Sequence, residues 1–186
     1  MRDCLWGGGV RAGRAVMGVR GFDGIEVSLE FGGARLFNQN INSWDVSNVV
    51  SMNYMFEDAR AFNQPLNNWV VSGVTDMSGM FDSAISFNQD ISSWNVSNVT
   101  NMSYMFAGTP YFNQPLSGWN VSNVTNMQGM FSYRYVGGIL KKCIFNSYIG
   151  NWDVSKVTDM SHMFASNQSF NQNIGSWNVS GVTTMY

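Results

Sequence analysis

Apolar and polar positions recur along this chain with a period of 25 residues. A Phe-Asn pair stands at positions 37, 62, 87, 112, 145 and 170, so a single interval of 33 residues interrupts a series of 25-residue intervals. A Trp follows each pair, at 44, 69, 94, 119, 152 and 177. A fixed period between about 20 and 50 residues is typical of repeat arrays. We therefore expect about six coils stacked along one axis.

The second half of each unit predicts a short helix. In the third unit, Val99, Met102 and Phe106 fall at i, i+3 and i+7, which places them on one face of a helix. Ser97 precedes them, where its hydroxyl would cap the first turn. We expect a helix over residues 98–107, too short to be stable without its neighbours.

The first half of each unit, such as residues 87–94, predicts a short extended segment. Pro65 and Pro115 stand where other units carry Asn or Asp. Because proline cannot donate to a strand ladder, we expect this position at a strand end, a bulge or a site that uses only the carbonyl. The two Pro units alternate with units of a different type, which indicates duplication of a 50-residue pair.

Two residue types repeat in every unit and predict structural ladders along the stack. An Asn at the same point of each coil can bond the backbone of its own and the next coil, which would satisfy buried polar groups. The Trp column would share one apolar interior, because stability in repeat arrays comes from contacts between neighbours. The ladder residues are Asn38, Asn63, Asn88, Asn113, Asn146, Asn171, Trp44, Trp69, Trp94, Trp119, Trp152 and Trp177.

Residues 1–36 do not match the unit and predict an atypical N-terminal arm or cap, followed by a repeat domain over 37–186. Residues 25–31 alternate apolar and charged side chains, so we expect an edge strand that caps the first coil. Residues 7–12 fit a loose dinucleotide fingerprint, but no apolar strand precedes them, and no nucleotide site is predicted.

The fourth unit carries an insertion within residues 132–144. Insertions into solenoids form loops on one face, and such loops often bind partners. The alternatives are a tolerated surface loop or an error of gene prediction. The chain also ends inside a unit, so we expect a capping segment or further copies to cover the last coil.

Composition narrows the class of function. Only 12% of residues are charged and the net charge is −2, which argues against an electrostatic grip on nucleic acid. There is no run of about 18 apolar residues, so no membrane span is expected. The N-terminus lacks the apolar core of a signal peptide. Cys4 and Cys143 do not make a disulfide framework.

Candidate chemistry is sparse. His162 is the only His and occupies a variable position of the unit, so we expect no metal site and no catalytic residue. Asp45 and Asp153 alternate with neutral residues in other units, which we interpret as surface variation. No cofactor is expected, and the chain is predicted not to be an enzyme.

The unit Phe-Asn-Gln-[Asp/Asn/Pro]-[Ile/Leu]-x-x-Trp-[Asp/Asn]-Val-Ser-x-Val-Thr-x-Met-x-x-Met-Phe resembles the repeat of BspA-like leucine-rich-repeat surface proteins over residues 37–186. This resemblance implies an α/β fold: a right-handed, leucine-rich-repeat-like solenoid with short parallel strands on one face and short helices on the other. It also implies a surface or secreted adhesion or interaction protein. The chain departs from lipoprotein members because Cys4 is too early for lipid attachment.

The leading functional hypothesis is a binding or adhesion solenoid that presents a repeated polar face to a protein or glycan partner. That face would contain a row of Gln side chains: Gln39, Gln64, Gln89, Gln114 and Gln172. Alternatively, the Gln row bonds only to itself and the array is purely structural. A second hypothesis is an ice- or crystal-surface-binding array of Thr75, Thr100, Thr125 and Thr158. A third is an enzyme that uses the inserted loop.

Overall fold

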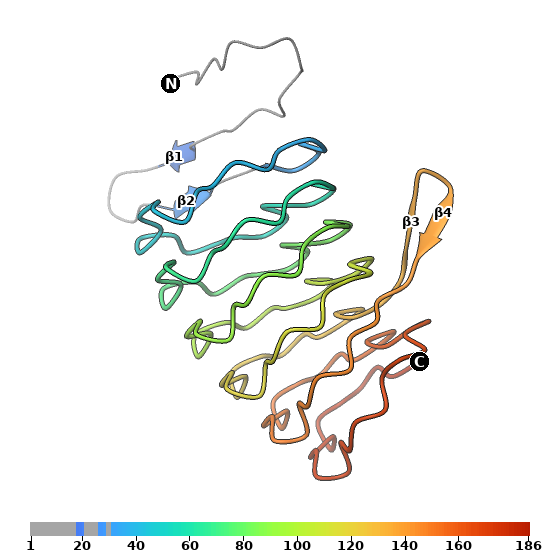
Figure 1. Ribbon diagram of the computed structural model, residues 1–186. Coiled ribbons are helices and arrows are strands. Elements are labelled where there is room, and N and C mark those ends of the chain that lie inside the picture. The colour runs from blue at the N-terminus through green and yellow to red at the C-terminus, as the bar shows by residue number, and fades with distance from the viewer. Residues whose placement is uncertain (1–17, 21–25, 29–30) are drawn as a thin grey trace.

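The protein is a stack of similar coils, seen in a computed structural model that describes residues 18–20, 26–28 and 31–186 (Figure 1). The coils follow one another along a single axis from the blue to the red end of the chain. A two-stranded hairpin stands out from one side of the stack. In the described part of the chain, no helix is long and apolar enough to cross a membrane.

Regular strands are few and short. Strand β1 (Gly18–Arg20) pairs antiparallel with β2 (Glu26–Ser28), which lies inside the segment expected to form an edge strand. Strand β3 (Arg134–Val136) pairs antiparallel with β4 (Ile139–Lys141), so the insertion forms the hairpin. The other predictions for residues 1–17, 21–25 and 29–30, including the fingerprint at 7–12, concern residues outside the described part of the chain.

The prediction of an α/β leucine-rich-repeat-like solenoid is wrong, because the described residues contain no helix and no parallel strand. Residues 98–107 form turns instead. The amides of Met102 and Tyr104 donate to carbonyls of the next coil at 3.0 and 2.7 Å, whereas Met105 donates within its own coil to the Met102 carbonyl. Tyr104 also has a φ of 57°, in the left-handed region that interrupts a helix.

Parallel contact between coils is limited to single bridges, one for each pair of coils. The bridges join Ser51, Asp76, Asn101, Asn126, Asp159 and Thr184 in a continuous column. Each bridge is followed by turns in which an amide bonds the carbonyl three residues earlier, as Met105 does to Met102 at 3.2 Å after the bridge at Asn101. The backbone amides therefore alternate between bonds to a neighbouring coil and bonds within a turn. Because the turns interrupt the pairing between coils, no continuous strand forms.

Two columns of Phe rings fill the core. Phe81 stacks on Phe106 with ring centroids 5.7 Å apart, and Phe87 of the other column lies 3.8 Å from Phe81. All three side chains are fully buried. Phe31 extends the first column, with its ring 5.4 Å from that of Phe56, and its amide donates to the Met55 carbonyl. The stack thus includes residues before Phe37.

Short polar side chains hold the turns in place of helix caps. The Ser97 amide donates to Asn95 Oδ1 at 3.2 Å, so the expected cap at Ser97 is replaced by an Asx turn. The Ser92 amide donates to Asp90 Oδ1 in the same way. Asp90 occupies the position that Pro65 holds in the preceding unit. An Asx side chain and the fixed φ of proline are two ways to start a turn, which explains why they alternate.

Odd and even coils interlock through a large and a small residue. Gly79 and Gly129 both have a φ of +58°. A Cβ atom at Gly79 would overlap the Tyr54 ring, and one at Gly129 would overlap the Tyr104 ring. Each Tyr therefore lies over the Gly of the following coil, which gives the 50-residue pair a packing reason.

Candidate functional site

The Asn residues form a continuous ladder along one side of the stack. The Oδ1 atom of each Asn accepts the backbone amide of the corresponding Asn in the next coil. The donor–acceptor distances from Asn38 to Asn171 are 2.9, 3.0, 3.2, 2.7 and 2.8 Å. This ladder ties consecutive coils in one register.

The Gln row lies beside this ladder and is bonded to it. The Nε2 atom of Gln89 donates to the carbonyl and the Oδ1 atom of Asn63, at 3.0 and 2.9 Å, and Gln114 makes the same pair of bonds to Asn88. Gln64 and Gln172 each donate to one Asn Oδ1. Gln39, in the first coil, is exposed. The side-chain amides of Gln64, Gln89, Gln114 and Gln172 are therefore held in fixed positions, with their nitrogens directed toward the preceding coil.

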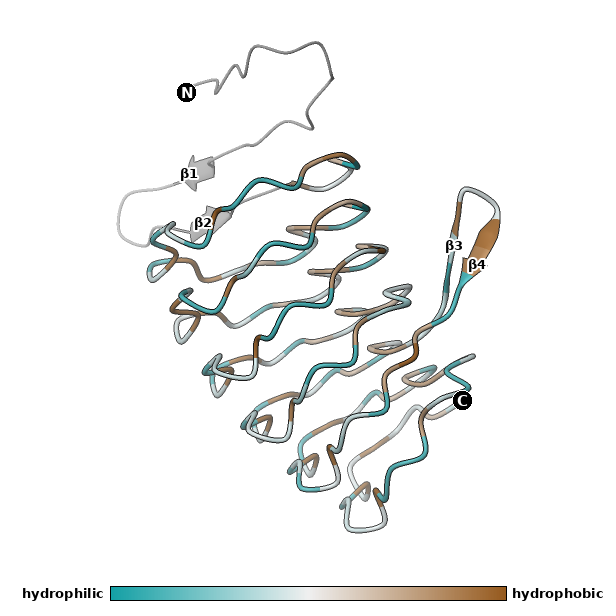
Figure 2. Cartoon of the chain, in the orientation of Figure 1, coloured by the Kyte–Doolittle hydropathy of each residue, from teal (hydrophilic) through white to brown (hydrophobic). Residues whose placement is uncertain are grey.

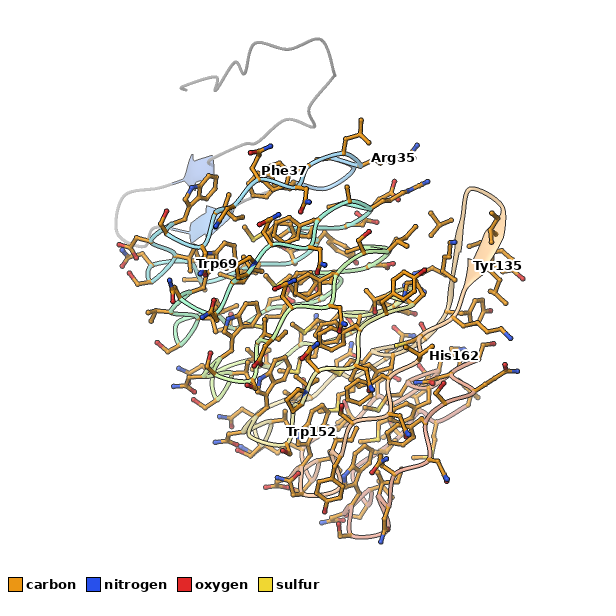
Figure 3. All side chains as sticks on the ribbon, in the orientation of Figure 1. Arg35, Phe37, Trp69, Tyr135, Trp152 and His162 are labelled. Atoms are coloured by element: carbon orange, nitrogen blue, oxygen red, sulfur yellow. The ribbon has the colours of Figure 1, made fainter. Side chains whose placement is uncertain are left out.

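The Trp column lies in the interior, away from the hairpin (Figure 3). Trp94 Nε1 donates to the Leu66 carbonyl of the preceding coil at 3.1 Å. Trp69, Trp119, Trp152 and Trp177 make the equivalent bond at 3.0 to 3.2 Å. Trp44, at the start of the column, is 37% exposed. The column is a structural ladder that combines apolar burial with one hydrogen bond per coil.

A second polar column runs along an exposed face. The side chains of Thr75, Thr100, Thr125, Thr158 and Thr183 are exposed. Each amide donates at 2.8 Å to the residue at the corresponding position of the preceding coil, and each Oγ1 donates to the same carbonyl at 3.1 to 3.4 Å. These hydroxyls form an evenly spaced row.

The inserted hairpin is anchored to coils that are distant in sequence. Arg134 forms an ion pair with Asp82, 52 residues earlier, with Nη2 and Oδ2 2.9 Å apart. The Arg134 guanidinium also lies over the Tyr104 ring, 4.3 Å from its centroid. A Cβ atom at Gly108 would meet the Arg134 side chain at 2.6 Å, so Gly108 permits this approach. The hairpin therefore lies against the third and second coils.

Burial dominates the electrostatics of this ion pair. The Asp82 side chain is only 8% exposed, and burial raises the pKa of its carboxyl although Arg134 and Ser83 favour the charged form. The hydrogen bond and the positive charge stabilise a carboxylate that would otherwise be costly to bury. The ion pair thus holds the hairpin against the second coil, and burial of the Asp82 carboxylate away from water opposes this stabilisation.

A cleft of about 330 Å³ lies at the base of the hairpin. Its wall contains the rings of Tyr133 and Tyr135, which meet edge to face at 89° with centroids 5.9 Å apart. Tyr135 is 68% exposed and projects from the hairpin, while His162 lies below it on the same side of the stack (Figure 3). The cleft is lined by Tyr104, Ser132, Tyr133, Arg134, Tyr135, His162 and Ala165.

The sequence predicts that the insertion is a possible binding loop and that His162 occupies a variable position of the unit. It does not indicate that the two features adjoin, because only the stacked fold brings residues 133–135 beside His162. The signal available in the sequence was the density of aromatic residues at Tyr133 and Tyr135, in a segment outside the repeat.

Cys143 is buried next to the hairpin, and burial raises the pKa of its thiol to about 11. A thiol with such a pKa forms little thiolate at neutral pH and is a poor nucleophile. Cys143 therefore acts as a small core residue.

Comparison with known proteins places the repeat in one family. The model of the family described as Mycoplasma protein of unknown function, DUF285, matches residues 25–98, 67–136 and 138–186. Repeated matches along one chain agree with a repeat protein. No curated protein and no solved structure matches the chain.

Proposed function

The chain belongs to the DUF285 family of repeat proteins, and on that premise we propose that it is a non-enzymatic binding solenoid, which presents a repeated polar face to a protein or glycan partner. The observation that supports this proposal is the fixed row of Gln side chains beside the Asn ladder. Side chains that are already ordered lose little entropy on binding. The resemblance of the unit to BspA-like surface proteins favours a place at a cell surface.

The Gln row offers a partner one group in each of five coils, and the coil that begins at Phe145 carries Ser147 at this position. Because the Nε2 atoms of Gln89 and Gln114 donate to the Asn of the preceding coil, the Gln Oε1 atom is the group available for an incoming donor. A partner with evenly spaced donors would gain several weak contacts at once, and such multivalent contacts raise the overall affinity.

A triple substitution tests this proposal. Gln64, Gln89 and Gln114 are replaced by Ala, and binding of the purified chain to immobilised glycans and extracellular-matrix proteins is measured by biolayer interferometry. We expect at least a tenfold loss of affinity for a partner that binds the unmodified chain. The matched control replaces Thr75, Thr100 and Thr125 by Val on the other polar column. Equal affinity of the Gln variant, with its fold intact by circular dichroism, would refute the proposal.

A second function is favoured by the exposed Thr column. Its five hydroxyls are repeated at each coil and held by bonds to the backbone, which is the order expected of a surface that binds ice or another crystal. Thermal hysteresis of the unmodified chain, lost in the triple Thr variant and kept in the triple Gln variant, would support this function. Absence of hysteresis in the unmodified chain would exclude ice.

A further inference from the structure

The hairpin cleft is the one place in the described stack where aromatic side chains outside the repeat gather around a hollow. Tyr133 and Tyr135 are 37% and 68% exposed, and their perpendicular rings leave faces open to a ligand. Exposed large aromatic residues that line a cleft mark binding surfaces. In Figure 2 the ribbon of β4 is brown, because Ile139 and Leu140 are apolar residues.

The lining supplies polar groups around these rings. The exposed His162 and the hydroxyls of the Tyr residues provide both donors and acceptors. A ligand that fits must therefore combine an apolar face with a rim of hydrogen-bonding groups. A volume of about 330 Å³ lies at the lower end of the range of small-ligand sites, so the ligand is small.

The charge of the lining residues restricts the class of ligand further. Arg134 is the positively charged side chain of the lining, and it disfavours a cationic ligand of the kind that aromatic cages bind. Its guanidinium is already paired with Asp82 and lies over Tyr104, so it offers little to an anion. The lining therefore repels a cation and has its Arg already paired, so it favours a neutral ligand over an ionised one.

We propose that the hairpin cleft binds a neutral saccharide unit, which packs its C–H face on Tyr135, the more exposed of the two rings, and bonds its hydroxyls to the polar rim. This site is separate from the repeated polar face. The insertion supplies the rings of Tyr133 and Tyr135, and the coils beside it supply Tyr104, His162 and Ala165.

The test measures binding of the full chain to cellotriose, chitotriose, mannotriose and maltotriose by saturation-transfer NMR and calorimetry. Sialyllactose, choline and a phage-displayed peptide library serve as acidic, cationic and peptide probes. We expect one or more neutral trisaccharides to bind, with an affinity that is unchanged between about 0.05 and 0.5 M NaCl. Tyr135→Ala should weaken binding about tenfold, since loss of one aromatic contact raises the Kd by about that factor.

Two controls separate this site from the rest of the molecule. Tyr111→Ala removes a Tyr that is 60% exposed outside the cleft and should leave saccharide binding unchanged. The triple Gln variant should also keep saccharide binding. The proposal is overturned if no neutral saccharide binds, if binding survives Tyr135→Ala, or if only the acidic, cationic or peptide probes bind in a Tyr135-dependent way.

Discussion

At the scale of single residues, the Trp of each unit after the first contributes its indole N–H as well as its size. Trp94 is 3% exposed, and its Nε1 atom donates to a carbonyl of the preceding coil. A buried donor without an acceptor would cost about 1–3 kcal/mol, so the register of the coils and the identity of the residue depend on each other. Phe would fill much of the same volume without linking the coils.

Trp94→Phe should therefore lower the free energy of unfolding by about 1–2 kcal/mol through the lost bond and the smaller ring. The control is Trp44→Phe at the exposed start of the column, where no carbonyl of a described residue accepts the indole N–H. We expect a smaller loss there. Urea unfolding followed by circular dichroism measures both. Equal losses would show that the inter-coil bond adds nothing.

Gly129→Ala tests the interlock between coils. A Cβ atom at this position would overlap the Tyr104 ring, which also lies 4.3 Å from the Arg134 guanidinium. Gly33 provides the control, because it has a φ of +73° with no atom within 4 Å of an added Cβ. Gly33→Ala should cost about 1 kcal/mol from backbone strain alone. Gly129→Ala should cost a further 1–3 kcal/mol or so from overpacking, and equal costs would contradict the packing account.

At the scale of elements, the period of the chain was predictable and the conformation within it was not. The spacing of Val99, Met102 and Phe106 fits a helix, yet it also fits turns that direct every third or fourth side chain inward. The choice between a helix and turns depends on which carbonyls accept the backbone amides. The amides of Met102 and Tyr104 donate to carbonyls of a coil about 25 residues away. A pattern within one unit carries no information on such bonds.

Two features of the sequence nevertheless indicate local structure that the structure contains. Phe31 and Ala34 precede Phe37 at the distances at which Phe56 and Ala59 precede Phe62, so the sequence already placed the end of a further unit before residue 37. Asp45 was interpreted as surface variation, but its Oδ1 atom accepts the Ser47 amide at 3.0 Å, an Asx turn that Asn satisfies equally well in other coils. The hydrogen bonds from Ser47 also lower the pKa of the Asp45 carboxyl.

The hairpin offers a prediction on pH dependence. Because the pKa of Asp82 is raised above its ordinary value of 3.8, the folded protein binds more protons than the unfolded chain above pH 3.8, and stability falls as pH rises through that window. Arg134→Ala removes the paired cation, so it should enlarge this fall and cost about 1–2 kcal/mol at pH 7. Arg134→Ala combined with Asp82→Asn should recover part of that loss.

Thermal unfolding at pH 3 and pH 7 distinguishes these variants. At pH 3 Asp82 is protonated in both states, so Arg134→Ala and the double variant should have similar Tm values. At pH 7 the double variant should be the more stable of the two. A constant difference at both pH values would mean that Arg134 acts through packing on Tyr104 and Gly108, and not through the charge of Asp82.

At the scale of the whole molecule, stability should depend on which coils are neighbours as well as on how many there are. Each coil bonds both neighbours through the Asn ladder, the Trp column and the backbone. These contacts are the same for every pair. The Tyr-over-Gly contact is different, because it requires a Tyr coil to be followed by a Gly coil.

Two deletions of equal length separate these effects. Removal of 62–86 places Tyr54 against Tyr104, whereas removal of 87–111 places the Gly79 coil against the Gly129 coil. Both deletions are made with Arg134→Ala, so that the ion pair of the hairpin is absent from each. We expect each variant to unfold in one transition below the Tm of the full-length Arg134→Ala chain, with the 62–86 deletion the less stable because its two rings compete for one space.

Adding Tyr54→Gly to the 62–86 deletion should raise its Tm toward that of the 87–111 deletion, since the substitution removes the competing ring and suits the φ of 54° at that position. The same substitution in the full-length chain should lower Tm, because there Tyr54 covers Gly79. Opposite signs for one substitution in two neighbour contexts would establish that coils are matched in pairs. The same sign in both would reduce the stack to a sum of equivalent units.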